Sequence, residues 1–194
     1  MNSLKKIDPR GLIYLAILVL VAAVFIYMRG KEESPGDYQV KTGNYRLEDG
    51  QLTEALNEFL LALEKKPDHP HAHLGLAITY MQMKRYEEAE EEFSRTIALE
   101  PELAAAYADR GILLDRLGRY EEALADYKKA LAIDAGVLEG PGWLWRFLRN
   151  MDKKPPAVAD RARYLEEELQ KPPDKRLLTN PEIDKQQRMY KVDG

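Results

Sequence analysis

Hydrophobic residues are distributed along this chain in two different patterns. The first is a continuous run: from Leu12 to Met28, 17 residues carry no charge, proline or amide side chain. The second begins after residue 35, where apolar residues recur at intervals of three and four between charged ones, as in amphipathic helices. The sequence therefore predicts one uniformly apolar helix followed by a helical domain.

The continuous run is long enough to cross a bilayer. At about 1.5 Å per residue it covers about 26 Å, and the flanking Arg10 and Arg29 can reach the headgroups at the edges of a hydrocarbon core about 30 Å thick. Tyr14 and Tyr27 lie near its ends, where aromatic rings favour the membrane interface. We therefore predict a short basic N-terminus in residues 1–10, a transmembrane helix in residues 11–29 and a linker in residues 30–35.

A cleaved signal peptide is the alternative for this segment, with residues 21–23 (Val-Ala-Ala) as the cleavage site. The apolar run continues beyond that site, which favours an uncleaved anchor. Lys5, Lys6 and Arg10 give the N-terminal flank more positive charge than the other flank. The positive-inside rule then predicts a cytoplasmic N-terminus and a domain outside the cytoplasm, in the periplasm if the source is bacterial.

The helical domain contains a tandem repeat. The string RYEEA occurs at residues 85–89 and again at residues 119–123, an offset of 34 residues. The same offset relates one aromatic column and one column of small residues: Phe59, Phe93 and Tyr127, and Gly43, Ala77 and Gly111. Three units are predicted, in residues 36–69, 70–103 and 104–137.

Each unit is expected to form a pair of helices. In the second unit, apolar or small residues recur at helical spacing from Leu74 to Met81, residues 84–85 interrupt the pattern, and it resumes at Ala89 until Pro101 ends the second helix. A single hairpin cannot bury its apolar face, but a stack of hairpins can. The repeat therefore predicts a solenoid.

The units resemble the tetratricopeptide repeat (TPR), a 34-residue motif with a small residue, alanine, an aromatic residue, alanine and proline at fixed positions. At these positions the second unit has Ala77, Ala89, Phe93, Thr96 and Pro101. The third unit has Gly111, Ala123, Tyr127, Ala130 and Ala135. Thr96 and Ala135 depart from the motif, and the first unit matches least well, because Thr42 and Arg46 replace apolar residues in its first helix. The resemblance implies an all-α, TPR-type α-solenoid of three hairpins plus capping helices, behind the single N-terminal transmembrane helix.

The C-terminal part has no repeat phase. Residues 138–171 are predicted to form a capping helix pair, whose Trp143 and Trp145 either cover the last repeat or anchor a partner. Residues 172–194 are predicted to form an extended tail. This tail is richer in large apolar residues, including Tyr190, than disordered tails usually are, so we expect it to dock on the solenoid or on another subunit.

Composition argues against several kinds of chemistry. The 194 residues include no cysteine, which excludes disulfides and cysteine-ligated metals, and the net charge of −4 argues against nucleic acid as a partner. There is no phosphate loop, HExxH or GxSxG motif. His69, His71 and His73 are spaced so that neighbours point roughly 200° apart on a helix, which disfavours a shared metal. We therefore predict no enzyme activity, no cofactor and no metal, and we expect acidic runs such as residues 90–92 on a solvated face.

The resemblance also implies where a protein partner binds, in a concave groove lined by the first helix of each unit. The groove residues would be Val40, Asn44 and Leu47; His71, Leu74, Ile78 and Met81; and Ala105, Ala108, Ile112, Asp115 and Arg116. Such a mixed, rather apolar surface suits an amphipathic helix or an extended peptide. Family members that clamp the acidic C-terminus of heat-shock chaperones use a set of Lys, Asn and Arg. Only Asn44 matches that set here, so this clamp is not expected.

These expectations lead to a non-catalytic, membrane-anchored scaffold that acts as an adaptor or assembly factor for a membrane or periplasmic protein complex. A permanent accessory subunit of a multi-subunit membrane complex is the alternative. A third possibility is a protein receptor facing the cytosol, which requires the opposite orientation. The predicted partners are other proteins, bound through the groove, the tryptophan segment or the tail, and the lipid bilayer, bound through residues 11–29.

Overall fold

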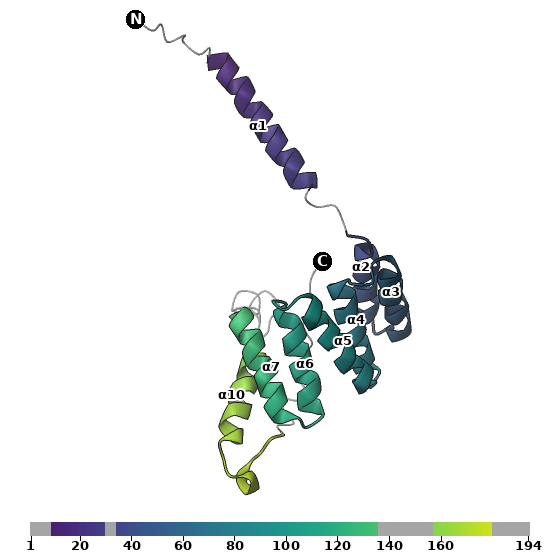
Figure 1. Ribbon diagram of the computed structural model, residues 1–194, viewed down its shortest axis with the longest axis vertical. Coiled ribbons are helices and arrows are strands. Elements are labelled where there is room, and N and C mark those ends of the chain that lie inside the picture. Colours follow the sequence, from purple (N-terminus) through teal and green to yellow (C-terminus); the bar gives the residue numbers. More distant parts are fainter. Residues whose placement is uncertain (1–8, 30–33, 136–156, 180–194) are drawn as a thin grey trace, which may run out of the picture. The chain divides into compact units, whose positions relative to one another are not determined.

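The computed structural model describes residues 9–29, 34–135 and 157–179 (Figure 1). The chain divides into two units, Met1–Ser34 and Pro35–Gly194. Within the described residues there are eight α-helices, one short 3-10 helix and no β-strand. The prediction of an all-α chain holds for this part of the protein.

The first unit contains helix α1 (Pro9–Arg29). The side chains described in α1 are those of residues 13–24, and all of them are exposed. Over the residues that the structure describes, no helix is long and apolar enough to cross a membrane.

The second unit is a stack of helix hairpins. Its first six helices are α2 (Asp37–Glu48), α3 (Leu52–Lys65), α4 (Pro70–Gln82), α5 (Tyr86–Leu99), α6 (Ala104–Arg116) and α7 (Tyr120–Ile133). Each first helix packs on the second helix of its own hairpin, and each second helix packs on the first helix of the next. Apolar faces that a lone hairpin would expose are therefore covered by its neighbours.

A left-handed residue closes the turn inside each hairpin. Gly50, Lys84 and Gly118 occupy this position at the repeat offset, with φ angles of 73°, 62° and 76°. Glycine adopts this conformation at little cost, whereas a residue with a Cβ atom is strained in it. The middle hairpin therefore carries strain at Lys84 that its neighbours avoid.

The aromatic column forms the centre of the core. Phe59, Phe93 and Tyr127 are fully buried. Close helix approach requires glycine beside two of these rings. A Cβ atom on Gly75 would lie 2.2 Å from Phe59 Cε1, and one on Gly111 would lie 2.6 Å from Tyr127 Cδ1. The aromatic rings thus fill space that glycine leaves on the facing helix.

Helix α10 (Val158–Leu169) packs against α7 and closes the stack (Figure 1). It begins where the backbone N–H of Ala157 donates to Asp160 Oδ2 at 3.0 Å. It corresponds to the second helix of the predicted capping pair, and a 3-10 turn, Pro173–Lys175, follows it. The first helix of that pair, with Trp143 and Trp145, and the tail residue Tyr190 lie outside the described residues.

Candidate partner-binding surface

The predicted groove residues lie on the first helix of each hairpin, on α2, α4 and α6. Nine of the twelve are buried: Val40, Leu47, Leu74, Ile78, Met81, Ala105, Ala108, Ile112 and Asp115. Asn44 and His71 are half-buried, and Arg116 is exposed. Within the predicted set, these three side chains are the most accessible to solvent. The groove itself stays a prediction.

The burial has an identifiable cause at α4 and α6. Helix α4 contacts α2 and α6 in addition to its hairpin partner α5 and the preceding α3. Every residue from Ala72 to Thr79 is buried, so α4 has no solvated side along this stretch. Helix α6 contacts α4, α5 and α7, and its Asp115 reaches α10. Helices α4 and α6 thus form the interior of the stack as well as part of its predicted binding face.

A buried ion pair joins α10 to the last hairpin. Arg161 on α10 donates from Nε and Nη2 to the two carboxylate oxygens of Asp115 on α6, each at 2.7 Å. The side chains of Arg161 and Asp115 are only 1% and 4% exposed. Tyr127 on α7 donates its hydroxyl to the same carboxylate at 3.1 Å. Asp115 is therefore part of the contact that docks α10.

The beginning of the tail folds back along α10. Arg161 Nη2 donates to the carbonyl of Leu178 at 2.8 Å, and Tyr164 donates to the carbonyl of Leu177. The N–H of Leu177 donates in turn to Glu168 Oε2 at 2.7 Å. This hydrogen bond, together with that from Lys171, lowers the pKa of Glu168. The bonds to side chains of α10 thus hold residues 177–178 in place.

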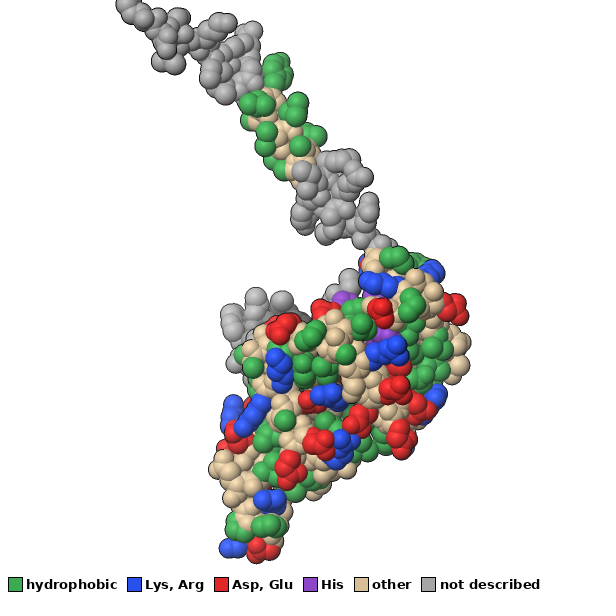
Figure 2. All heavy atoms as spheres, in the orientation of Figure 1, with side chains coloured by type: hydrophobic (Ala, Val, Ile, Leu, Met, Phe, Trp, Pro, Cys, Tyr) green, Lys and Arg blue, Asp and Glu red, His purple; other side chains and the backbone are tan. Residues whose placement is uncertain are grey.

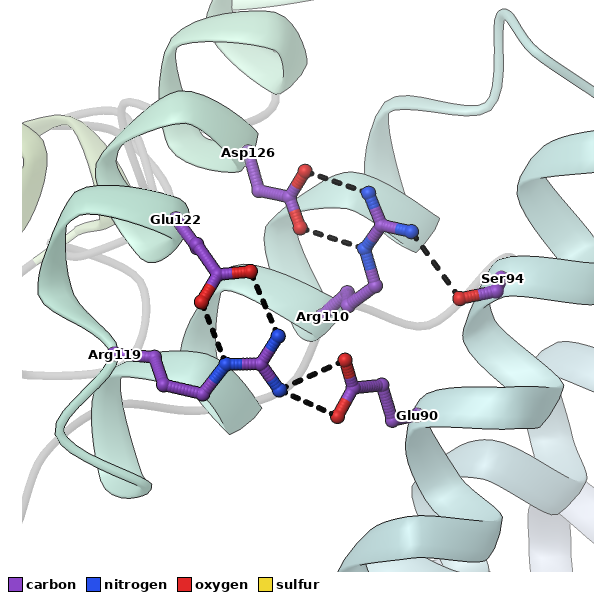
Figure 3. Close-up of polar contacts among 6 residues, drawn as sticks. All are labelled: Glu90, Ser94, Arg110, Arg119, Glu122 and Asp126. Carbon is purple, nitrogen blue, oxygen red and sulfur yellow. Dashed lines mark hydrogen bonds and ion pairs between the residues drawn. The ribbon is translucent and has the colours of Figure 1, made fainter.

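Arg119 provides a polar link between hairpins. Figure 3 shows its guanidinium between two carboxylates: Nε and Nη2 donate to Glu122 at 2.7 Å, and Nη1 donates to both oxygens of Glu90 at 2.7 and 2.8 Å. These bonds, to Glu122 first and to Glu90 second, raise the pKa of Arg119. Glu90 was expected on a solvated face with the other acidic residues. It is instead half-buried, because it joins α5 to the start of α7.

A second link lies beside the first. Arg110 on α6 donates from Nε and Nη2 to the carboxylate of Asp126 on α7, at 2.7 and 2.8 Å, and from Nη1 to the hydroxyl of Ser94 on α5 at 3.2 Å (Figure 3). The hydrogen bond to Asp126 raises the pKa of Arg110. Both arginines make hydrogen bonds between helices, so the arrangement links neighbouring helices of the hairpin stack.

Each of the three histidines lies near a different carboxylate. His69 Nε2 lies 2.8 Å from Asp37 Oδ1, across the first two hairpins. His73 Nδ1 lies 2.5 Å from Glu92 Oε2, and its Nε2 lies 2.9 Å from the carbonyl of Pro67. In the described ranges there is no group of three metal-ligating side chains. Burial lowers the pKa of His71, against the attraction of Glu100.

Two sequence models of the tetratricopeptide repeat match the chain, at residues 46–109 and at residues 104–136. Residues 46–136 contain tetratricopeptide repeats. The offset of 34 residues and the hairpin stack both agree with this assignment. No curated protein matches the chain.

Solved TPR domains share this fold. The first TPR of Spaghetti (RPAP3) bound to the HSP90 peptide SRMEEVD has 20% sequence identity and a TM-score of 0.56, over 72% of this chain and 97% of that one. The first TPR domain of human RPAP3 has 23% identity and a TM-score of 0.51, over 61% and 90%. The Arabidopsis OM64 TPR domain has 22% identity and a TM-score of 0.50, over 52% and 84%. The predicted TPR-like helical repeat fold is confirmed.

Sequence reasoning missed the docking role of Arg161. A signal was present, because Val158, Arg161, Ala162 and Leu165 recur at helical spacing, which places an arginine on the apolar face of its helix. An arginine at such a position needs a buried carboxylate. Asp115 is the carboxylate that the structure supplies.

Proposed function

We propose that this chain is a membrane-anchored, non-catalytic scaffold that binds a protein partner through its TPR hairpins. The observation that supports the binding role is the hairpin stack itself, whose fold is shared with TPR domains that include one bound to a peptide. The proposed contact region comprises the accessible members of the predicted groove, Asn44, His71 and Arg116, together with the surface around them.

The peptide carried by that relative is not the expected ligand. It is named as SRMEEVD of HSP90, which contains two glutamates and a terminal aspartate. At the positions where chaperone-clamping TPRs use Lys, Asn and Arg, this chain has Val40, Gly75, Ala105 and Asp109 besides Asn44. The first three cannot bind a carboxylate through their side chains, and the fourth would repel one. A fluorescence anisotropy titration with this peptide should show no saturable binding.

The proposed anchor is residues 11–29. Its support comes from the sequence, with 17 consecutive residues free of charge, and from α1, whose described side chains include exposed apolar ones such as Leu18 and Val19. The excess of basic residues before the anchor supports an orientation in which the TPR unit lies outside the cytoplasm, in the periplasm if the source is bacterial.

Co-purification from native membranes tests the scaffold role. The full chain is extracted in mild detergent, and the proteins that accompany it are quantified after a wash at high salt. A matched pair of variants shows whether the hairpin surface is responsible: Arg116→Glu changes the accessible groove position, and Arg95→Glu changes an exposed position on α5. We expect the first variant to lose the partner and the second to retain it. Equal retention by both variants would refute binding through the groove.

The same experiment distinguishes the two modes of association. A permanent accessory subunit remains in stoichiometric amount through detergent and salt, whereas an adaptor or assembly factor loses its partner on dilution. The adaptor or assembly role is the version that we propose, and loss of the partner on dilution would support it over the permanent subunit.

A further inference from the structure

Two tyrosines are prominently exposed on the first hairpin. Tyr38 and Tyr45 on α2 are 67% and 70% exposed. They are seven residues apart, which places them on one face of the helix, about two turns from each other. The opposite face of α2, with Val40, Gly43 and Leu47, is buried against the hairpin stack. The tyrosine side chains therefore project away from the rest of the unit.

Charged and polar residues surround this tyrosine pair. Thr42 lies between the two rings along the helix and donates its hydroxyl to the carbonyl of Tyr38 at 2.9 Å. Lys41 and Arg46 flank the face, and Glu48 and Asp49 follow at the carboxyl end of α2. Two positive and two negative groups leave little net charge. Figure 2 shows hydrophobic side chains next to basic ones over α2 and α3.

The position of α2 in the sequence limits its distance from the proposed anchor. Helix α1 ends at Arg29 and α2 begins at Asp37, eight residues later. A fully extended chain of eight residues, at about 3.4 Å per residue, spans about 27 Å. If α1 lies in a bilayer, the start of α2 is confined to a zone next to the headgroups, whatever conformation the connection adopts.

A surface of this composition suits that zone. A tyrosine ring has an apolar body and a polar tip, and such side chains concentrate at the level of the headgroups, where both parts find favourable surroundings. Lysine and arginine extend their aliphatic stems along apolar material while their charged ends remain in water. A strongly charged docking surface would point to an oppositely charged protein, and this face has little net charge.

We propose that the Tyr38 and Tyr45 face of α2 lies against the lipid headgroups of the membrane that holds α1. This proposal rests on the proposed anchor. It assigns the exposed face of the first hairpin to the membrane surface.

The absence of cysteine from the chain allows a direct test with single labelling sites. Thr42→Cys places an environment-sensitive fluorophore between the two tyrosines without removing either. Arg163→Cys places it on α10, at a side chain 69% exposed and at the other end of the stack. Val19→Cys places it in α1. Each full-length variant is reconstituted in vesicles of phosphatidylcholine and phosphatidylglycerol, with a quencher attached to the lipid headgroup or dissolved as iodide.

We expect headgroup quenching at residue 42 to exceed that at residue 163 several-fold, and to persist at high salt. Introducing Tyr38→Ser and Tyr45→Ser together should reduce the quenching at residue 42 to the level at residue 163. The label at residue 19 should be protected from iodide and quenched by lipids brominated in the acyl chain.

The labels separate failure of this inference from failure of the anchor. If the label at residue 19 contacts lipid but headgroup quenching at residue 42 is no greater than at residue 163, the anchor is supported and the inference about the tyrosine face is refuted. Protection of residue 42 from both quenchers would mean that protein covers this face, which also overturns it. Quenching at residue 42 that survives loss of both tyrosines would show that the aromatic pair is not responsible. If residue 19 does not contact lipid, the anchor fails and the inference fails with it.

Discussion

Replacing Arg161 by methionine should release α10 from the hairpin stack. Arg161→Met keeps most of the side-chain volume and its helix propensity, but it removes both hydrogen bonds to Asp115 and the one to the carbonyl of Leu178. The Asp115 carboxylate, 4% exposed, is then left in the interior without its guanidinium. The variant therefore tests whether this pair docks the closing helix.

The expected loss of stability in Arg161→Met can be estimated from the burial of the ion pair. Removing one partner of a buried ion pair costs about 3–5 kcal/mol, because the remaining charge is desolvated without compensation. That is a large part of the roughly 5–15 kcal/mol that stabilises a typical domain. Contacts of a repeat stack extend only to nearest neighbours, so the loss should fall on α10 and the adjacent α7 and leave the first two hairpins intact.

Hydrogen exchange followed by mass spectrometry on the full chain in detergent measures this locally. Amides of residues 158–169 should lose protection in Arg161→Met, while those of α4 and α5 keep theirs. Arg163→Met is the matched control, since Arg163 is on the same helix and its side chain is 69% exposed. The double variant D115L/R161M should recover much of the protection, because a buried pair replaced by apolar residues is often tolerated. Unchanged protection of α10 in Arg161→Met would refute the reasoning.

Three further predictions concern stability, measured by unfolding of the full chain with circular dichroism. Lys84→Gly should raise the free energy of unfolding by about 0.5–1 kcal/mol, because glycine relieves the left-handed strain, and Gly118→Lys should lower it by a similar amount. A less stable Lys84→Gly variant or a more stable Gly118→Lys variant would show that this position is not strained. Gly75→Ala should cost about 1–3 kcal/mol through the clash with Phe59, and adding Phe59→Leu should restore part of it; a neutral Gly75→Ala would show that the helices can separate freely. Because burial lowers the pKa of His71 below its ordinary value of 6.5, the unfolded chain binds the proton more readily, so stability is lost as pH falls through 6.5. His71→Gln should weaken this dependence below about pH 6.5, and an unchanged dependence would assign it to other groups.

The repeat architecture was predictable because it depends on short-range sequence patterns. The aromatic column, the small residues opposite it and the offset of 34 residues each specify packing between neighbouring helices. Even the poor match of the first unit has a physical reason. Thr42 is half-buried and Arg46 is exposed on α2, so apolar residues are not required at these two positions.

The accessible surface was harder to predict. The groove positions follow from family resemblance, but their burial depends on contacts between first helices and on elements outside the repeat phase. Asp115 illustrates this point, because its partner Arg161 is 46 residues away in a segment without the repeat. Strain at Lys84 could have been anticipated from the glycines at the equivalent positions 50 and 118, since the repeat offset aligns all three.

Site-specific crosslinking in native membranes tests the central claim, that the hairpin stack binds another protein on its first-helix side, most directly. A photoactivatable amino acid is placed at Arg116 on α6 in one full-length variant and at Arg95 on α5 in another; both positions are exposed. We predict a discrete crosslinked product with a second protein from residue 116 and none from residue 95. No product from residue 116, or the same product from both positions, would contradict the account.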